Sequence, residues 1–101
     1  MIIEIAELHI KAGEEAAFEG GVANAVPLFL RAKGCHGVEL HQVIESPGIY
    51  RLVVRWETLE NHMVDFRNSE DFQSWRALVA GTFAAPPAVT HERIVDLGPS
   101  V

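Results

Sequence analysis

The stretch Ile49–Glu57, IYRLVVRWE, alternates apolar and polar side chains so regularly that it predicts a half-buried β-strand. Its even-numbered residues form one apolar face, and Arg51 and Arg55 lie on the other. The preceding stretch Val38–Glu45 also alternates, and Ser46-Pro47-Gly48 between them is typical of a turn. We therefore expect an antiparallel hairpin in which Glu39 and Arg55 share a face and pair.

The remaining segments predict a single domain over residues 1–101. Branched residues favour a strand over Ile2–Ile10, and a helical stripe of apolar residues spans positions 13–33, with a bend or break near Pro27. A helix beginning at Glu57 or Thr58 is interrupted at Asn68-Ser69. A further helix then runs to Phe83, and VTHERIVDL (89–97) forms a last strand. This order is the β-α-β-β-α-β arrangement of α+β ferredoxin-like domains, with a four-stranded antiparallel sheet.

Helices can cover only one face of such a sheet, which leaves the other face to find a partner. We expect that face to carry a mixture of charged and apolar side chains, the apolar ones being Ile3, Ile5, Val43, Val53, Val89 and Val95. The mixture is too apolar to be left in water, so we predict a homodimer formed through the sheet faces.

Composition excludes several classes of function. A net charge of -6 argues against nucleic-acid binding, which requires a basic surface. No apolar run has the length of a membrane span, and the first ten residues lack the positive start of a signal peptide. The lone Cys35 excludes an intrachain disulfide, so we expect a cytoplasmic protein with no membrane partner.

Motifs for metal or cofactor chemistry are not found in the sequence. The five histidines lack the clustered spacing of metal ligands, so we predict no metal site. Cys35 lies in the loop GCHG, where a half-buried thiol is more common than a nucleophile. Phosphate-binding glycine loops, serine elbows and CxxC pairs are absent, and we predict no cofactor.

The stretch WETLENHMVDFRNSEDFQSWR (56–76) holds both tryptophans and a histidine. Rings such as Phe66, Phe72 and Trp75 most often fill a core. His62 falls on a helical stripe with Leu59, Met63 and Phe66 that we expect to face the sheet. It is therefore either a packing histidine or a group that opens into a cavity. With Arg76, it could bind an acidic aromatic in a cleft between helices and sheet.

Three parts of the sequence resemble the antibiotic biosynthesis monooxygenase family of dimeric α/β barrels: the strand ending in Trp56-Glu57-Thr58, the following LENHMVDFRNSEDFQSW, and the late PPAVTHE, which contains His91. The resemblance covers almost the whole chain in element order. Family members oxygenate electron-rich phenols, quinols or anthrones without metal or flavin. In them, the deprotonated substrate itself reduces dioxygen.

The resemblance implies roles for individual residues. Trp56 corresponds to a tryptophan that lines the ligand cavity of active members, and Arg76 to a cavity arginine of some polyketide oxygenases. Haem-degrading relatives need an asparagine in the first strand and a histidine ten residues after that tryptophan. This chain has Glu7 near the first position and Phe66 at the second, so haem breakdown is not expected.

Our leading hypothesis is a cofactor-independent monooxygenase that uses dioxygen to oxidise a small aromatic. His62 would be the general base and Arg76 would stabilise the substrate anion. The ligand would be enclosed by Trp56, Phe66, Phe72, Trp75 and His91. A non-catalytic ligand-binding or stress-response protein of the same fold is the alternative, and haem binding through one histidine is the third hypothesis.

Overall fold

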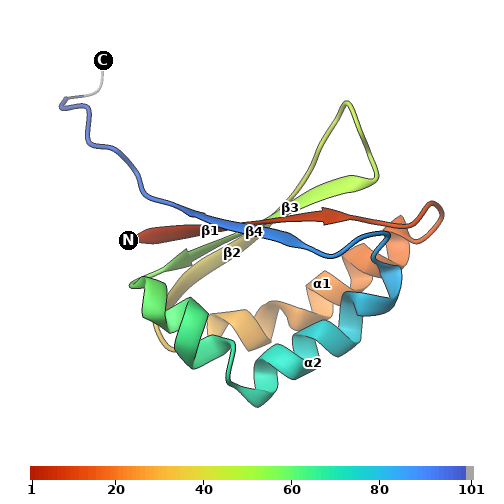
Figure 1. The fold of residues 1–101 in the computed structure, drawn as a ribbon, viewed down its shortest axis with the longest axis horizontal. Coiled ribbons are helices and arrows are strands. Elements are labelled where there is room, and N and C mark those ends of the chain that lie inside the picture. Colours follow the sequence, from red (N-terminus) through yellow and green to blue (C-terminus); the bar gives the residue numbers. More distant parts are fainter. Residues whose placement is uncertain (100–101) are drawn as a thin grey trace.

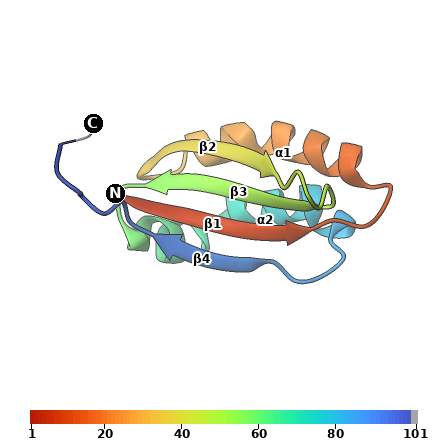
Figure 2. The same cartoon turned by 90° about the horizontal axis from the view of Figure 1, so that it is seen from above.

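The computed structural model describes residues 1–99, whose strands form one four-stranded antiparallel sheet (Figure 1). The sheet order is β2-β3-β1-β4. The strands are β1 (Ile2–His9), β2 (Cys35–Gln42), β3 (Ile49–Trp56) and β4 (Ala88–Glu92). Seen from above, the two central strands β3 and β1 lie between the outer strands β2 and β4 (Figure 2).

The helices pack together on one face of this sheet, which confirms the ferredoxin-like α+β fold (Figure 1). They are α1 (Glu15–Leu30), the π-helix η1 (Asn61–Phe66), α2 (Glu70–Val79) and the short 3-10 helix η2 (Ala80–Thr82). The predicted interruption before α2 is confirmed. Ser69 caps that helix, because its Oγ accepts a hydrogen bond from the Phe72 N–H at 3.2 Å.

The predicted hairpin is formed by β2 and β3. Arg55 Nη1 lies 3.2 Å from Glu39 Oε1, so the expected cross-strand pair is confirmed. The predicted bounds of the hairpin's first strand, 38–45, were wrong by three residues at each end, since β2 spans Cys35–Gln42. The chain turns from Val43 onward, where backbone hydrogen bonds join Val43 to Ile49 at 2.9 Å and Ser46 to Val43 at 3.2 Å.

Helix α1 runs without interruption through Pro27, so the predicted break does not occur. Proline removes one helical hydrogen bond, but the helix is held on both sides of it by buried side chains. Phe18, Val22 and Ala25 precede Pro27 on the buried face, and Phe29 follows it. Packing against the sheet therefore outweighs the cost of the proline.

The last strand is shorter than predicted. Glu92 already pairs with Ile3 near the start of β1, so residues beyond it have no strand to bond. The chain leaves the sheet there and extends away from the domain (Figure 1). Val95 consequently lies outside the sheet, and so does Val43 in the turn. Their predicted positions on the free face were wrong.

Ile3, Ile5 and Val53 do lie on the face without helices. Side chains alternate between the two faces along a strand, and these three lie on the face of the exposed Arg51, opposite to the buried Ala6 and Leu52. Val89 was assigned to the wrong face. It pairs with Ala6 and packs against the core on the helix side.

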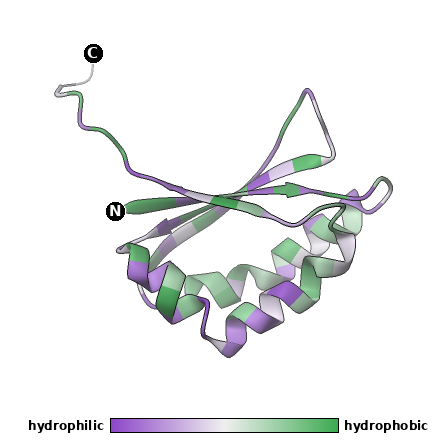
Figure 3. Ribbon diagram, in the orientation of Figure 1, coloured by the Kyte–Doolittle hydropathy of each residue, from purple (hydrophilic) through white to green (hydrophobic). Residues whose placement is uncertain are grey.

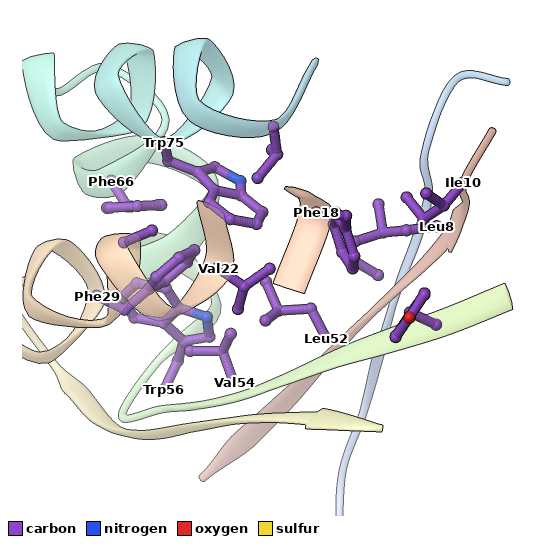
Figure 4. Packing of buried hydrophobic residues seen from close by; sticks show 14 residues of the cluster. Leu8, Ile10, Phe18, Val22, Phe29, Leu52, Val54, Trp56, Phe66 and Trp75 are labelled. Atoms are coloured by element: carbon purple, nitrogen blue, oxygen red, sulfur yellow. The ribbon is translucent and has the colours of Figure 1, made fainter. Parts of the chain in front are cut away.

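The core lies between the sheet and the helices, where aromatic rings from both layers meet (Figure 4). Phe29 of α1 contacts Phe66 and Trp75, each with ring centroids 5.1 Å apart. Coloured by hydropathy, helix α1 is apolar over most of its length, whereas apolar and polar segments alternate along α2 (Figure 3).

Adjacent glycines in α1 allow a matched test of the contact between α1 and α2. A Cβ at Gly21 would lie 2.9 Å from the Leu78 carbonyl oxygen, whereas a Cβ at Gly20 would meet nothing within 4 Å. We expect Gly21→Ala to lower the free energy of unfolding by about 1–3 kcal/mol. Gly20→Ala should raise it by about 0.5–1 kcal/mol through helix propensity. Urea denaturation measures both, and an equal effect of the two changes would contradict the close contact.

Candidate active site

A cavity of about 490 Å³ opens between the sheet and the segment that joins η1 to α2. This volume is in the range of small-molecule sites. Four of the predicted site residues line it: His62, Phe72, Trp75 and Arg76. The rest of the wall comes from Glu4, Ala6, Leu8, Leu52, Met63, Arg67, Asn68, Phe83, Pro87 and Val89.

The π-helical form of η1 determines which side chains reach this cavity. Its backbone bonds join residues five apart, as shown by the Arg67 N–H donating to the His62 carbonyl at 3.2 Å. His62 and Arg67 therefore lie on the same side of the helix. The predicted α-helical stripe was wrong for Leu59 and Met63, whose exposed fractions are 46% and 37%.

The start of η1 is anchored by Asn61, which is buried. Its Oδ1 accepts hydrogen bonds from the Thr58 N–H at 3.0 Å and the Thr58 hydroxyl at 2.9 Å. Gly34 packs directly against it with a positive φ of 79°, and a Cβ there would lie 2.1 Å from Asn61 Oδ1. This contact holds the first turn of η1 in place, and His62 with it.

A buried carboxylate is the centre of the polar network beside the cavity. Glu4 is 4% exposed, on the β1 face that carries Ala6 and Leu8. Its Oε1 accepts a hydrogen bond from Trp56 Nε1 at 2.9 Å and lies 3.3 Å from His62 Nε2. The Trp56 indole stacks on the His62 imidazole, with ring centroids 5.4 Å apart and planes at 17°.

The second nitrogen of His62 is also engaged. Its Nδ1 lies 2.8 Å from Nε2 of His91, which is half-buried on β4 directly opposite Glu4. Either imidazole can donate this hydrogen bond to the other, according to its tautomer. Glu4, His62 and His91 thus lie next to one another in one row of polar groups.

Burial changes the proton affinities of these groups. It raises the pKa of Glu4 to about 7, with the Trp56 hydrogen bond and the charge of Arg67 opposing the shift. Burial, together with repulsion by His91 and Arg67, lowers the pKa of His62 to about 4. At neutral pH His62 is therefore uncharged, and its contact with Glu4 is not an ion pair.

Comparison with known proteins places this fold in a family. The family model for antibiotic biosynthesis monooxygenases matches residues 1–78. The chain belongs to this family. Its fold matches a Bordetella bronchiseptica structure, named as a candidate antibiotic biosynthesis monooxygenase, with a TM-score of 0.92 and 62% identity. That match covers 93% of this chain and 96% of the other.

Two further relatives extend the comparison. The uncharacterised protein YczJ of Bacillus subtilis is 40% identical over 91 residues, which is 90% of this chain and 96% of YczJ. A candidate antibiotic biosynthesis monooxygenase from Nitrosomonas europaea has 18% identity and a TM-score of 0.81, covering 94% of this chain and 99% of its own. At that identity the likeness is one of fold alone. The shared family supports a monooxygenase-like role in general terms.

Three predicted ligand-binding residues stand behind the cavity wall. Trp56 is fully buried and contacts Glu4 and His62. Phe66 packs against Phe29 in the core (Figure 4). His91 reaches the site through His62. Their contribution is to hold the residues that line the cavity.

Sequence reasoning missed two charged residues of the wall, Glu4 and Arg67. Glu4 could have been found, because it shares strand parity with Ala6 and Leu8 and so must point toward the helices. Arg67 could not, since an α-helix would not have aligned it with His62. Within residues 1–99, no cluster of three or more potential metal-ligating side chains is present, and no helix is long and apolar enough to cross a membrane.

The raised pKa of Glu4 predicts a specific pH dependence of stability. In the unfolded chain Glu4 ionises near its ordinary value of 4.5, so this residue costs stability as the pH rises toward about 7. We expect Glu4→Gln to gain about 3 kcal/mol relative to wild type across that interval. His62 has the opposite effect: because its pKa is lowered in the folded state, the protein loses stability as the pH falls below 6.5. This effect is present in both wild type and Glu4→Gln.

The measurement is urea unfolding at a series of pH values. Glu7→Gln is the matched control, because Glu7 lies on the same strand but its pKa is lowered by His9 and Arg51. That change should become more harmful, not less, as the pH rises. A stability difference for Glu4→Gln that does not vary with pH would contradict the buried carboxylate.

Proposed function

We propose that this protein is a cofactor-independent monooxygenase that oxidises a small aromatic of the phenol, quinol or anthrone type. One observation carries the proposal: a buried Glu4–His62 pair in the wall of a cavity of about 490 Å³. The reaction needs a group that removes a substrate proton and a site that shelters the resulting anion. The family supports the reaction class.

Glu4 and His62 share the role of the base. Both ring nitrogens of His62 already have partners, and its pKa of about 4 makes it a weak proton acceptor alone. Glu4 has a pKa of about 7, which suits general base catalysis near neutral pH. Its Oε2 makes no hydrogen bond within residues 1–99 and can accept the substrate proton. His62 and His91 then stabilise or carry that proton.

The anion supplies the electrons for the reaction with dioxygen. In an anthrone, the ring CH₂ loses two hydrogens and becomes a carbonyl, while the second oxygen atom leaves as water. The substrate therefore provides all four electrons. Arg76 stabilises the negative charge from the cavity rim. Phe72 and Trp75 enclose the ring, Phe66 supports Phe72 from behind, and Trp56 packs against Phe66.

A second copy of the chain covers the free face of the sheet. Ile3, Ile5 and Val53 form an apolar strip there, and Ile5 pairs directly with Val53. Around it, Glu7 pairs with Arg51 at 3.2 Å and Glu39 with Arg55 at 3.2 Å. Charges paired within their own sheet can be covered at lower cost than free ones. A homodimer through this face is thus the arrangement we propose, in the cytoplasm.

The non-catalytic alternative uses the same cavity for binding without oxidation. Haem binding differs in its spectrum, since a Soret band would appear on haem addition. Oxygen uptake separates the monooxygenase from the non-catalytic binding protein, and absorption spectra separate haem binding from both.

Loss of the buried base should abolish most of the oxygen uptake. With an anthrone or quinol substrate, we expect Glu4→Gln and His62→Gln each to lower turnover by about 100-fold or more. His41→Gln is the matched control, since His41 is exposed on the free face of the sheet. An oxygen electrode and isotope-labelled dioxygen measure rate and incorporation.

Turnover should also rise with pH through about 7, because the carboxylate form of Glu4 is required. Equal rates for wild type and Glu4→Gln would remove this residue from the mechanism. A panel of phenols, quinols and anthrones that bind without oxygen uptake would favour the non-catalytic protein.

Disruption of the free face should separate the subunits. We expect Ile5→Lys to convert a dimer into the 11.1 kDa species in sedimentation experiments at micromolar concentration. A buried lysine without a partner is costly at an interface. Ile44→Lys is the control, because Ile44 is 89% exposed in the hairpin turn. Wild-type protein that sediments as a monomer would overturn the proposed dimer.

A further inference from the structure

We propose that the cavity selects an aromatic that bears a carboxylate, and that Arg67 is the residue that binds this group. The inference deepens the proposed function, because it takes the cavity as the substrate site. It assigns the charge of the ligand and a recognition residue that the sequence did not indicate.

The first support is the pairing of arginines elsewhere in the structure. Arg31 lies 2.6 Å from Asp71, Arg51 pairs with Glu7, and Arg55 pairs with Glu39. The two arginines that line the cavity, Arg67 and Arg76, make no ion pair with any residue in the described range 1–99. Arg93, exposed beyond β4, also has no ion pair within residues 1–99, so what distinguishes Arg67 and Arg76 is that their charges line the cavity.

The second support is the burial of one atom of Arg67, whose side chain as a whole is half-buried. Its Nε is shielded from solvent and has no hydrogen-bond acceptor among the described residues. A buried donor without an acceptor destabilises a fold and therefore indicates a missing partner. Arg67 lines the cavity, so an acceptor of a bound ligand can contact its guanidinium. The π-turn that places Arg67 above His62 directs it to the same end of the cavity as Glu4.

A carboxylate fits this arginine better than a neutral hydroxyl does. The guanidinium presents parallel N–H donors that match the two oxygens of a carboxylate. A phenol in its ground state offers one weak acceptor and leaves the positive charge uncompensated. Arg76 is exposed at the rim, where water screens its charge, so it attracts anions with less selectivity.

Glu4 lies at this end of the cavity, and its protonation is coupled to the binding of an anion. It faces Trp56, His62, His91 and Arg67, and a bound anion nearby would oppose its ionisation. Binding should therefore be accompanied by proton uptake, and affinity should fall as the pH rises through about 7. Below that pH the protonated Glu4 can donate a hydrogen bond to the ligand.

The experiment compares naphthoate with naphthalenemethanol, a neutral ligand of similar shape. Both tryptophans adjoin the site, so quenching of their fluorescence reports binding of either probe. At pH 6 we expect wild type to bind naphthoate at least about tenfold more tightly than the alcohol. Arg67→Gln should lose this preference, while its affinity for the alcohol stays unchanged.

Arg93→Gln is the matched control, since it removes the same charge from an exposed position beyond β4. It should keep the preference for naphthoate. If Arg67→Gln does not fold, as judged by circular dichroism, Arg67→Lys retains the charge without the fork and should show a reduced preference. Glu4→Gln should remove the pH dependence of naphthoate binding.

Several outcomes would overturn the inference: equal affinity of wild type for the two probes, no binding of naphthoate, or equal losses in Arg67→Gln and Arg93→Gln. The proposed function fails separately. Selective naphthoate binding with no oxygen uptake from any hydroxylated aromatic acid would leave the carboxylate site standing without the oxygenase. Oxygen uptake from quinols by a wild-type protein that binds naphthoate no more tightly than the alcohol would do the reverse.

Discussion

The burial of the Glu4 carboxylate is the constraint on which the site depends. A carboxylate removed from water is costly unless hydrogen bonds compensate it. Trp56 donates such a bond at 2.9 Å, and His62 Nε2 lies 3.3 Å from the same carboxylate oxygen; both residues are themselves buried. The requirement links β1, β3 and η1, and through His91 it includes β4. One acidic residue thus joins three strands and a helix around the end of the cavity.

The π-helix is the second element on which function rests. Bonds between residues five apart place His62 and Arg67 on one side, where an α-helix would have placed Phe66 closer to His62. The irregular turn is held by Asn61 and Gly34 at its start and by the Ser69 cap after its end.

These two features combine a proton acceptor and a cation at the same end of one cavity. Glu4 accepts a proton near neutral pH, and Arg67 attracts negative charge. The negative charge of an ionised Glu4 disfavours an anionic ligand, whereas the positive charge of Arg67 favours one. The arrangement suits chemistry in which a proton leaves an aromatic and the remaining charge must be sheltered from water.

The sequence by itself determined the fold and much of the cavity's aromatic wall. Alternation in IYRLVVRWE identified a strand and its buried face, and the Ser69 cap marked the start of α2, because these signals are local. Only the tertiary structure decided the polar site. Glu4 and Trp56 are 52 residues apart, and their hydrogen bond exists because β1 and β3 pair in one register. The form of η1 likewise depends on contacts with Gly34 and the sheet, which a periodicity read along one segment does not contain.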